Sequence, residues 1–383
     1  RFFRYALLGE ELRLAEDVIL SIEHGFIVHI EENANSHDAD EILLDSLATP
    51  AFINPHTHLG DSVAKEAAWD ATIDEAVGKN SIKFRKLRNR ASEMPIAIRM
   101  MLRDLVQCGV VAFADFREEG IDGVNFLKKQ ISDYPGKPII LGRPTADLSD
   151  LVAVTQSSDG LGIPTTTFYS DNELARIKTA AKQNGKLLVV HCAETKEERQ
   201  LSLENFGEND VLRAIELLEA DILIHMTTAT PKDLLLAKEH GVGVVFCPRS
   251  NAYFGIGFPP VNEALSMQIP VALGTDNAMV LHPDPLQEAR WLALQLRLKG
   301  IKPNPQELLR MITVNPAKML ALSSGILEVG KRANILATNL NTPRTSYCED
   351  PILALLMRAT PEDYVLVSFG DDVIYSDNER NSL

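Results

Sequence analysis

The spacing of apolar residues differs between the two ends of the chain and its middle. Both ends contain short β-rich runs broken by turn residues, a pattern typical of antiparallel strands. These runs are Val18–Ile22, Phe26–Ile30, Ala333–Thr338 and Val365–Tyr375. Glu23-His24-Gly25 separates the first two and has the composition of a compact hairpin turn. Because both ends share this pattern around a different middle, we predict one small composite β-sandwich domain from residues 1–48 and 324–383.

In the middle of the chain, continuous apolar runs alternate with segments of helical periodicity. The predicted strands include Val110–Ala114, Ile139–Leu141, Leu187–Val190, Ile222–Ile224, Val242–Phe246 and Val271–Leu273. Helical patterns such as Asn172–Gln183 and Pro231–His240 lie between them. This alternation predicts a parallel sheet with both faces covered. The roughly 235 residues from about residue 50 to about residue 285 hold close to eight units of about 30 residues. We therefore predict a (β/α)8 TIM-like barrel over residues 49–323.

A doubly wound open sheet is the structural alternative to the barrel. Its nucleotide-binding versions carry a glycine-rich phosphate loop. The chain has neither GxGxxG after an early strand nor GxxxxGK[ST], and Val329-Gly330-Lys331 lacks the glycine spacing of such a loop. We therefore favour the barrel.

The composition narrows the class of protein. The chain has 383 residues, of which 45% are hydrophobic and 24% charged, as in ordinary globular proteins. A net charge of −15 disfavours nucleic acid and anionic membranes as partners. Four cysteines without CxxC spacing exclude a disulfide scaffold and favour a reducing compartment. No apolar stretch approaches the roughly 18 residues of a membrane helix. We expect a cytoplasmic protein with a small-molecule substrate; a homodimer remains open.

Four of the predicted strands end in imidazole or carboxylate groups. In a parallel barrel, the carboxyl ends of the strands form the rim that carries the chemistry. The residues at these ends are His56, His58, His191, His225 and Asp276, with Glu194 three residues beyond His191. Each of them alone is more often a core histidine or a turn residue. Their coincidence at four strand ends points instead to one site.

The pair His56 and His58 has a physical logic as a metal site. Alternate side chains of an extended strand point the same way, so both imidazoles can face one ion. Together with a carboxylate they suit a divalent metal such as zinc, with a position left open for water; Fe²⁺ and Mn²⁺ are alternatives.

The spacing of these residues also favours a closed barrel. From His191 to His225 is 225 − 191 = 34 residues, about one strand–helix unit, so these histidines should lie on neighbouring strands. From His225 to Asp276 is 276 − 225 = 51 residues, enough for one more strand between them. Numbered from His56, the strands involved are then 1, 5, 6 and 8. They approach one another only if the sheet closes.

Seven motifs in order along nearly the whole chain resemble the amidohydrolase superfamily, and within it the cytosine deaminase and triazine hydrolase branch. The motifs are PAFINPHTHLGDS, VVHCAET, LIHMT, CPRSN, LGTDNAM, ITVNPAKMLAL and GILEVGKRANIL. The resemblance implies a (β/α)8 barrel with a composite β-sandwich. It also implies that one divalent metal per chain is bound by His56, His58, His191 and Asp276. His225 would hydrogen-bond the substrate or a metal-bound hydroxide.

The resemblance also assigns proton-transfer roles. Glu194 matches the acid of the family's HxxE motif, and Asp276 would accept a proton from the attacking water. Binuclear members of the superfamily use a carboxylated lysine at the end of strand 4. The corresponding region here, Gly160–Tyr169, contains no lysine, so we expect a single metal.

The predicted reaction is hydrolysis of a carbon–nitrogen bond, by deamination of an amino-substituted heterocycle or a cyclic amidine. Loss of chloride or an alkylamine, or opening of a cyclic amide, would use the same groups. A non-catalytic barrel scaffold is the alternative from another class. Candidate substrate contacts on the rim are Asp61, Trp69, Arg249 and Asn251. Arg249 could grip a substrate carboxylate or carbonyl, or pair with a neighbouring acid as part of the rim.

Overall fold

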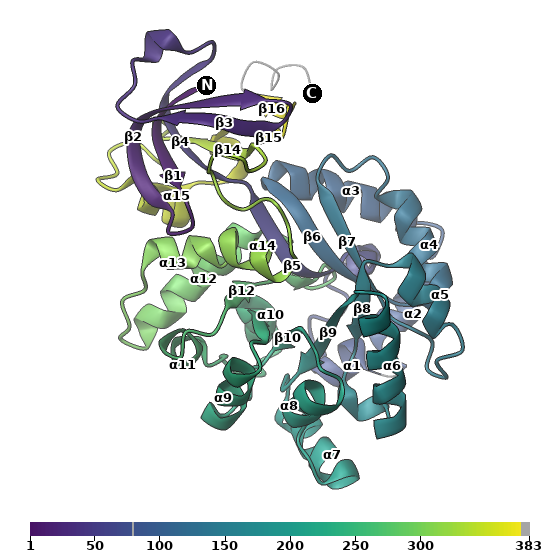
Figure 1. Cartoon of the computed structure of the whole chain (residues 1–383). Coiled ribbons are helices and arrows are strands. Elements are labelled where there is room, and N and C mark those ends of the chain that lie inside the picture. Colours follow the sequence, from purple (N-terminus) through teal and green to yellow (C-terminus); the bar gives the residue numbers. More distant parts are fainter. Residues whose placement is uncertain (79, 377–383) are drawn as a thin grey trace.

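The computed structural model describes residues 1–78 and 80–376, and its strands form two sheets (Figure 1). One sheet comes from the middle of the chain. The other is assembled from the two ends, whose colours in Figure 1 are purple and yellow. The division predicted from the apolar pattern is therefore present as two sheets.

The larger sheet is an all-parallel barrel. Its strands are β5 (Phe52–His58), β6 (Val110–Arg117), β7 (Lys137–Gly142), β8 (Gly160–Ile163), β9 (Leu187–Cys192), β10 (Ile222–His225), β11 (Gly243–Phe246), β12 (Val271–Leu273) and β13 (Asp276–Asn277). Each of β5 to β11 pairs with the next strand, and β13 returns to pair with β5 through Asp276 and Thr57. Because β12 and β13 are separated only by Gly274 and Thr275, they form the two halves of the eighth strand. The predicted barrel is confirmed.

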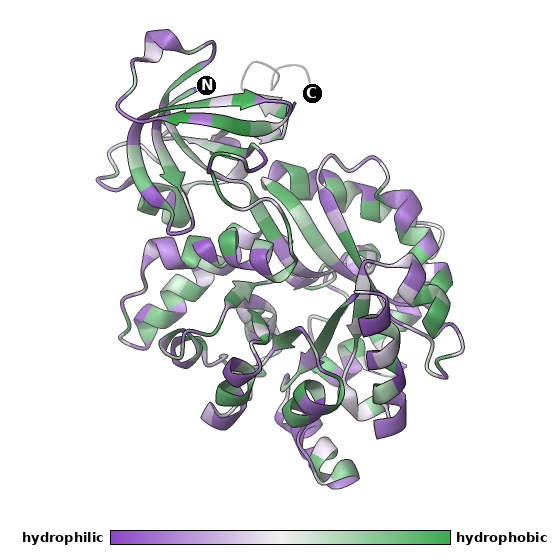
Figure 2. Cartoon of the chain, in the orientation of Figure 1, coloured by the Kyte–Doolittle hydropathy of each residue, from purple (hydrophilic) through white to green (hydrophobic). Residues whose placement is uncertain are grey.

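Helices surround this sheet (Figure 1). They are α1 (Ile73–Val77), α2 (Ile82–Asn89), α3 (Met94–Gln107), α4 (Gly120–Gln130), α5 (Leu151–Ser157), α6 (Asp171–Gln183), α7 (Lys196–Phe206), α8 (Asp210–Leu212), α9 (Pro231–Glu239), α10 (Pro248–Tyr253), α11 (Val261–Ser266), α12 (Pro285–Leu298), α13 (Pro305–Arg310), α14 (Val314–Met319) and α15 (Pro351–Arg358). With helices on the outside and side chains filling the interior, strands such as β6 are buried at every residue. Figure 2 shows the resulting contrast between apolar strands and helices with polar outer surfaces. Among the described residues, no helix is long and apolar enough to cross a membrane.

The smaller sheet interleaves the two ends of the chain. Its strands are β1 (Phe2–Leu8), β2 (Arg13–Glu23), β3 (Phe26–Glu31), β4 (Ile42–Pro50), β14 (Asn334–Asn339), β15 (Tyr364–Phe369) and β16 (Asp372–Ser376). Their order is β16-β15-β14-β4-β1-β2-β3, so β14 from the C-terminal segment pairs with β4 from the N-terminal one. The expectation of purely antiparallel strands was wrong in one place, because β1 and β4 are parallel. That pairing requires the long β2–β3 excursion between them.

This smaller sheet curls until its two ends meet. The hairpin between β2 and β3 turns at His24 and Gly25, which both have positive φ, 51° and 77°. Gly25 then accepts a hydrogen bond from the N–H of Ala333, immediately before β14. Side chains from strands at both ends of the order, including Leu20 and Leu366, share one buried cluster. The small sheet therefore encloses a core of its own.

The two sheets are joined by packing as well as by the chain. β4 passes into β5 through Ala51, whose N–H donates to the carbonyl of Asn334. The C-terminal helix α15 packs on the barrel helices α12 and α13, and its buried Leu355 belongs to the main core. The guanidinium of Arg290 on α12 also donates to the carbonyl of Leu356 at 2.8 Å. The barrel thus packs against segments from both ends of the chain.

Candidate active site

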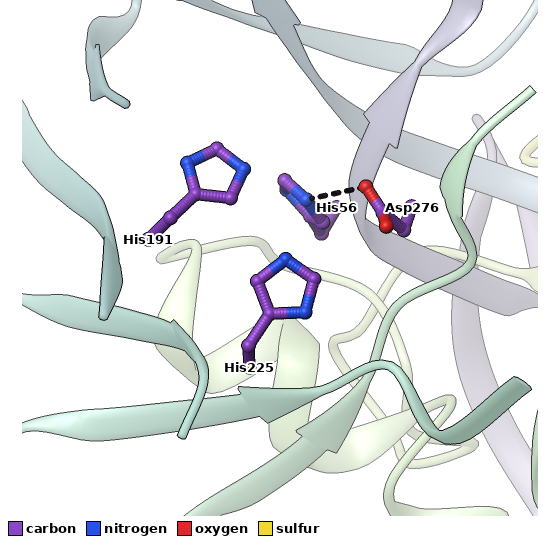
Figure 3. A group of neighbouring side chains, drawn as sticks. All are labelled: His56, His191, His225 and Asp276. Carbon is purple, nitrogen blue, oxygen red and sulfur yellow. Dashed lines mark ion pairs between the residues drawn. The ribbon is translucent and has the colours of Figure 1, made fainter. Parts of the chain in front are cut away.

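Three histidines and an aspartate from four barrel strands converge at the carboxyl rim (Figure 3). His56 comes from β5, His191 from β9, His225 from β10 and Asp276 from β13. One donor atom of each lies within 4.8 Å of the others, and all four side chains face the same space. The adjacency expected from the 34-residue spacing is present, because His225 pairs in register with Cys192, the residue after His191.

His58 lies at the edge of the same group. Its Nε2 is 3.4 Å from His191 Nε2 and 3.6 Å from Asp276 Oδ1. Asp276 Oδ1 is in turn 3.2 Å from His56 Nε2. An ion with bonds of about 2.1 Å in a tetrahedral site holds its donors about 3.4 Å apart. The three spacings among the predicted ligands are close to that value, whereas the four donors that lie within 4.8 Å of one another include His225 in place of His58.

The hydrogen bonds of His56 also fit a metal ligand. His56 is fully buried, and neither ring nitrogen has an aligned hydrogen-bond partner, although Nε2 faces Asp276. Buried polar atoms without a partner are costly and need an explanation. Burial lowers the pKa of His56 to about 3, so its imidazole is neutral at ordinary pH. A neutral imidazole with a free lone pair is the form that binds a divalent ion.

Hydrogen-bond partners of Nδ1 orient the rings of two further histidines, His191 and His225. His191 Nδ1 lies 3.2 Å from the carbonyl oxygen of Ile163 on β8, so Nδ1 donates and Nε2 keeps its lone pair toward the site. His225 Nδ1 lies 3.3 Å from Asn251 Oδ1, while Asn251 Nδ2 donates to Thr227 Oγ1 at 2.9 Å. The amide of Asn251 thereby fixes which ring nitrogen of His225 faces the site.

Asp276 is held as a carboxylate. Burial would raise its pKa, but the close contact with His56 and the neighbouring imidazoles of His225 and His58 bring it well below its usual value. Ser250 Oγ donates to Asp276 Oδ2 at 2.5 Å, leaving Oδ1 to face the histidines. The sequence contained Ser250 in the CPRSN motif, but gave it no role.

Glu194 has the opposite tendency. Its Oε1 lies 3.4 Å from His225 Nε2. Burial, its largest influence, raises the pKa of Glu194, and the charge of Asp276 adds to the rise while His225 opposes it. The site therefore contains one carboxylate that resists protonation and another that favours it, an arrangement suited to acid–base chemistry.

Several residues that carry or adjoin the site have strained backbone conformations. Ala193, His225, Met226 and Asp276 have φ between 46° and 73°, a region that costs non-glycine residues about 1 kcal/mol or more. At Ala193 the strain is held from both sides. Asp210 Oδ2 accepts its N–H at 2.5 Å, and Thr228 donates both its N–H and its hydroxyl to the Ala193 carbonyl. This clamp lies between His191 and Glu194, and no sequence pattern signalled Asp210.

Asp61 takes part in a buried charge network next to His58. Its Oδ2 accepts from Lys83 Nζ at 2.8 Å and from Asn277 Nδ2 at 2.7 Å. Lys83 also contacts Glu118 Oε1 at 2.5 Å, and that oxygen lies 3.7 Å from His58 Nδ1. Although burial lowers the pKa of Lys83, the charges of Asp61 and Glu118 raise it above the usual value. No sequence motif pointed to Lys83, which lies on α2.

The other predicted substrate contacts are placed as follows. Arg249 contacts Glu288 Oε1 at 3.4 Å and donates to the carbonyls of His282 and Asp284, which is the rim pairing that the sequence left open. Asn251 is fully buried behind His225. Trp69 is 72% exposed and lines a rim cavity of about 560 Å³ together with acidic residues of the loop after β5.

The region expected to be strand 4 is β8, the fourth strand counted from β5, and it reads GLGI without a lysine. Lys186, which precedes β9, donates to the carbonyl of Ser158 at 2.7 Å, at the opposite end of the barrel. Neither feature supplies a bridging ligand for a second ion beside His191. A single metal in this site stays a prediction.

Comparison with known proteins identifies the family. The model of the amidohydrolase family matches residues 47–368, most of the chain. Because the match covers most of the chain, the chain belongs to the amidohydrolase family. The motifs predicted this family, and the match spans the whole barrel together with the end of β4, β14 and nearly all of β15 in the small sheet. A protein of Methanocaldococcus jannaschii is 34% identical over 85% of this chain and 87% of its own length. The 5-methylthioadenosine/S-adenosylhomocysteine deaminase of Pyrococcus horikoshii is 27% identical over 94% and 90%.

Solved structures share the fold of this amidohydrolase. A zinc-bound adenosine deaminase from Xanthomonas campestris superimposes with a TM-score of 0.86 at 18% identity, covering 99% of this chain and 93% of its own. The atrazine chlorohydrolase of Arthrobacter aurescens, complexed with zinc, gives a TM-score of 0.84 at 17% identity, covering 98% and 94%. These structures share the predicted fold, and because both contain zinc, they support a divalent metal.

Proposed function

We propose that this amidohydrolase deaminates an amino-substituted heterocycle or a cyclic amidine by metal-dependent hydrolysis. The observation that carries the proposal is a pair of carboxylates that contact one histidine cluster: Asp276 Oδ1 lies 3.2 Å from His56 Nε2, and Glu194 Oε1 lies 3.4 Å from His225 Nε2. Hydrolysis of an amidine needs both a proton acceptor for water and a proton donor for the ring nitrogen. A scaffold protein needs neither.

His56, His58, His191 and Asp276 are the residues that we propose hold the ion. Zinc is the ion we favour, because the donors are imidazole nitrogens and one carboxylate oxygen, and because similar structures contain zinc. When bound, such an ion lowers the pKa of a water molecule from about 15.7 toward about 7. The donor spacing of 3.2 to 3.6 Å and the unpartnered nitrogens of His56 support this assignment.

The chain's own residues would then divide the proton transfers. Asp276, kept anionic by its histidines, accepts the proton of the attacking water. Glu194, whose pKa is raised, delivers a proton to the ring nitrogen next to the attacked carbon. His225, oriented by Asn251 and 3.4 Å from Glu194, donates or accepts a hydrogen bond at the developing oxygen or amine. Ammonia leaves once the amino group is protonated.

The relatives favour an aminopurine as the substrate class. The curated relative from Pyrococcus horikoshii is named for deamination of 5-methylthioadenosine and S-adenosylhomocysteine, and the structure from Xanthomonas campestris for deamination of adenosine. Release of chloride or an alkylamine is the second candidate, since an atrazine chlorohydrolase shares the fold. Both reactions attack an sp² carbon of a nitrogen heterocycle, and they differ in the leaving group.

A substrate panel distinguishes these reactions. The zinc-loaded enzyme would be assayed for ammonia with adenosine, 5-methylthioadenosine, guanine, cytosine, pterins and aminotriazines, and for chloride with a chlorotriazine. We expect ammonia from at least one aminopurine and no chloride. Chloride release without ammonia would overturn deamination in favour of the second candidate. A chain without activity on the whole panel and without bound metal would favour the scaffold.

The setting of the reaction follows from the composition. We propose a cytoplasmic location, because all four cysteines are free thiols. The net charge of −15 argues against a nucleic-acid partner. A homodimer is the assembly that sedimentation velocity of the purified enzyme would test.

A further inference from the structure

A second group of metal-ligating side chains lies outside the candidate active site. Asp104 belongs to the last turns of α3, and Cys108 is the residue that ends this helix. His282 lies in the loop between β13 and α12. One oxygen, one sulfur and one nitrogen from these residues lie within 4.8 Å of one another. None of the three has a role in the proposed reaction.

The local geometry brings the donors together from two elements. Asp104 and Cys108 are four residues apart, so they lie on the same face of α3. His282 approaches that face from the loop, and its Nε2 is 2.7 Å from Asp104 Oδ2. The loop and the helix are therefore already in contact. Binding an ion would require the imidazole and the carboxylate to separate by only about 0.7 Å to reach the usual donor spacing.

The three side chains differ in exposure, as expected for a site that is open to solvent on one side. Cys108 is 1% exposed and forms the floor, whereas the side chains of His282 and Asp104 are 39% and 28% exposed. An ion could thus enter from solvent and keep a water molecule on the open side. Three protein donors with one open position is a common arrangement for zinc.

The donor chemistry favours a borderline-soft ion over calcium or magnesium. Those two ions prefer oxygen ligands, while thiolate and imidazole select zinc and its neighbours in the first transition row. In the free protein, burial and the charges of Asp284 and Asp104 raise the pKa of the Cys108 thiol above its usual range. A divalent cation favours the thiolate, and the thiol proton leaves to solvent as the bond forms.

We propose that Asp104, Cys108 and His282 form a second divalent-metal site, selective for zinc-like ions, which cross-links α3 to the loop that follows Asp276. The site is separate from the active site in its residues and its donor set. It does not depend on the proposed reaction. Because an ion that binds only the folded state stabilises it by mass action, occupancy should also raise the thermal midpoint of the protein.

Cobalt substitution tests this site with a signal that the active site does not give. The predicted active-site donors are nitrogen and oxygen, so a near-ultraviolet sulfur-to-cobalt charge-transfer band reports a thiolate ligand. The full chain would be freed of metal, titrated with Co²⁺ without oxygen, and followed by absorbance and by metal content. We expect two ions per chain and a charge-transfer band that saturates with one of them.

Two variants and a matched control complete the test. Cys108→Ser should abolish the band, and His282→Asn should weaken binding of that ion at least about tenfold, with the other ion and the activity retained. His240→Asn is the control, since His240 is similarly exposed and pairs with Glu216 away from the group. If Cys108→Ser does not fold, His282→Asn alone decides. Saturating Co²⁺ without the band, a band that survives Cys108→Ser, or unchanged affinity in His282→Asn would overturn the second site.

Discussion

Glu194 and Asp276 are carboxylates in one buried site that differ in what surrounds them. Three histidines lie around Asp276, whereas Glu194 contacts one histidine, His225. Desolvation disfavours a carboxylate, and only nearby positive or hydrogen-bonding groups can offset it. Two copies of the same functional group thus receive different protonation states and different parts in the reaction.

Replacing Glu194 by Gln tests this division. The amide keeps the size of the side chain but cannot transfer a proton, so we expect kcat to fall about 10² to 10⁴-fold with metal content unchanged. Activity and zinc content of the same preparation would be measured together. Glu197→Gln, on the exposed side of α7, is the matched control and should leave both unchanged. Near-normal turnover of the Glu194 variant at full metal occupancy would exclude its acid role.

The depressed pKa of His56 predicts how the metal-free protein responds to acid. The folded protein protonates His56 only near pH 3, whereas the unfolded chain does so near 6.5. Between these values the unfolded state binds more protons, so stability falls as the pH falls. From this group alone, the free energy of unfolding should be about 2 kcal/mol lower at pH 5 than at pH 7.5.

Urea unfolding of the chelator-treated protein at these two pH values measures the effect. His56→Asn should flatten the dependence, while the exposed His240→Asn should leave it as in the parent. An equal loss of stability in the parent and in His56→Asn would show that other groups cause it.

At the scale of elements, the end of β9 must turn sharply to bring His191 and Glu194 to the same rim. The turn depends on the left-handed backbone of Ala193, which the Asp210 carboxylate and Thr228 hold in place. Asp210 touches neither the substrate space nor the predicted ligands. It is a positioning residue that acts through the backbone of Ala193.

Asp210→Asn tests this positioning role. The amide has a single acceptor oxygen and no charge, so it should hold the N–H of Ala193 less firmly. We expect kcat to fall about tenfold or more, while KM changes little and the metal is retained. Asp159→Asn is the control, because Asp159 also accepts a strand N–H, that of Ile140, but precedes β8 at the far end of the barrel. Equal losses of kcat in both variants would indicate a general effect on the fold.

For the whole molecule, the two sheets share one main core. Leu7 of β1, Leu336 of β14 and Leu355 of α15 belong to the same buried cluster as the barrel strands. The small sheet is therefore packed into the barrel as well as connected to it. Parts that bury one another's apolar surface unfold together.

Leu355→Ala tests this coupling. The residue is fully buried, so its truncation should cost about 2 to 5 kcal/mol. Both tryptophans, Trp69 and Trp291, lie in the barrel, so their fluorescence reports the barrel, while circular dichroism reports both sheets. We expect the two signals to shift together to lower urea. Leu298→Ala, at a residue 81% exposed, is the control and should shift neither. A loss seen by circular dichroism but not by fluorescence would mean that the small sheet unfolds alone.

The amino-acid sequence by itself determined the features that repeat over a few residues. Apolar runs that alternate with helical patterns specified the barrel, because the apolar residues of each strand or helix must recur at that element's own spacing to be buried together. The residues at strand ends were also readable, since the carboxyl end of a parallel strand has one location in a barrel. His56, His191, His225 and Asp276 are therefore brought together as their positions along the chain predicted.

The tertiary structure alone decided which distant side chains meet. Lys83 joins Asp61 and Glu118, Asp210 holds Ala193, and His282 reaches Asp104, yet none of these pairs shares a period or a motif. The tertiary structure also decided that β1 and β4 run parallel and that Arg249 pairs with Glu288. Such contacts depend on how elements pack once the sheet has closed. A local sequence pattern carries no information about them, because the partners are chosen by space and not by spacing.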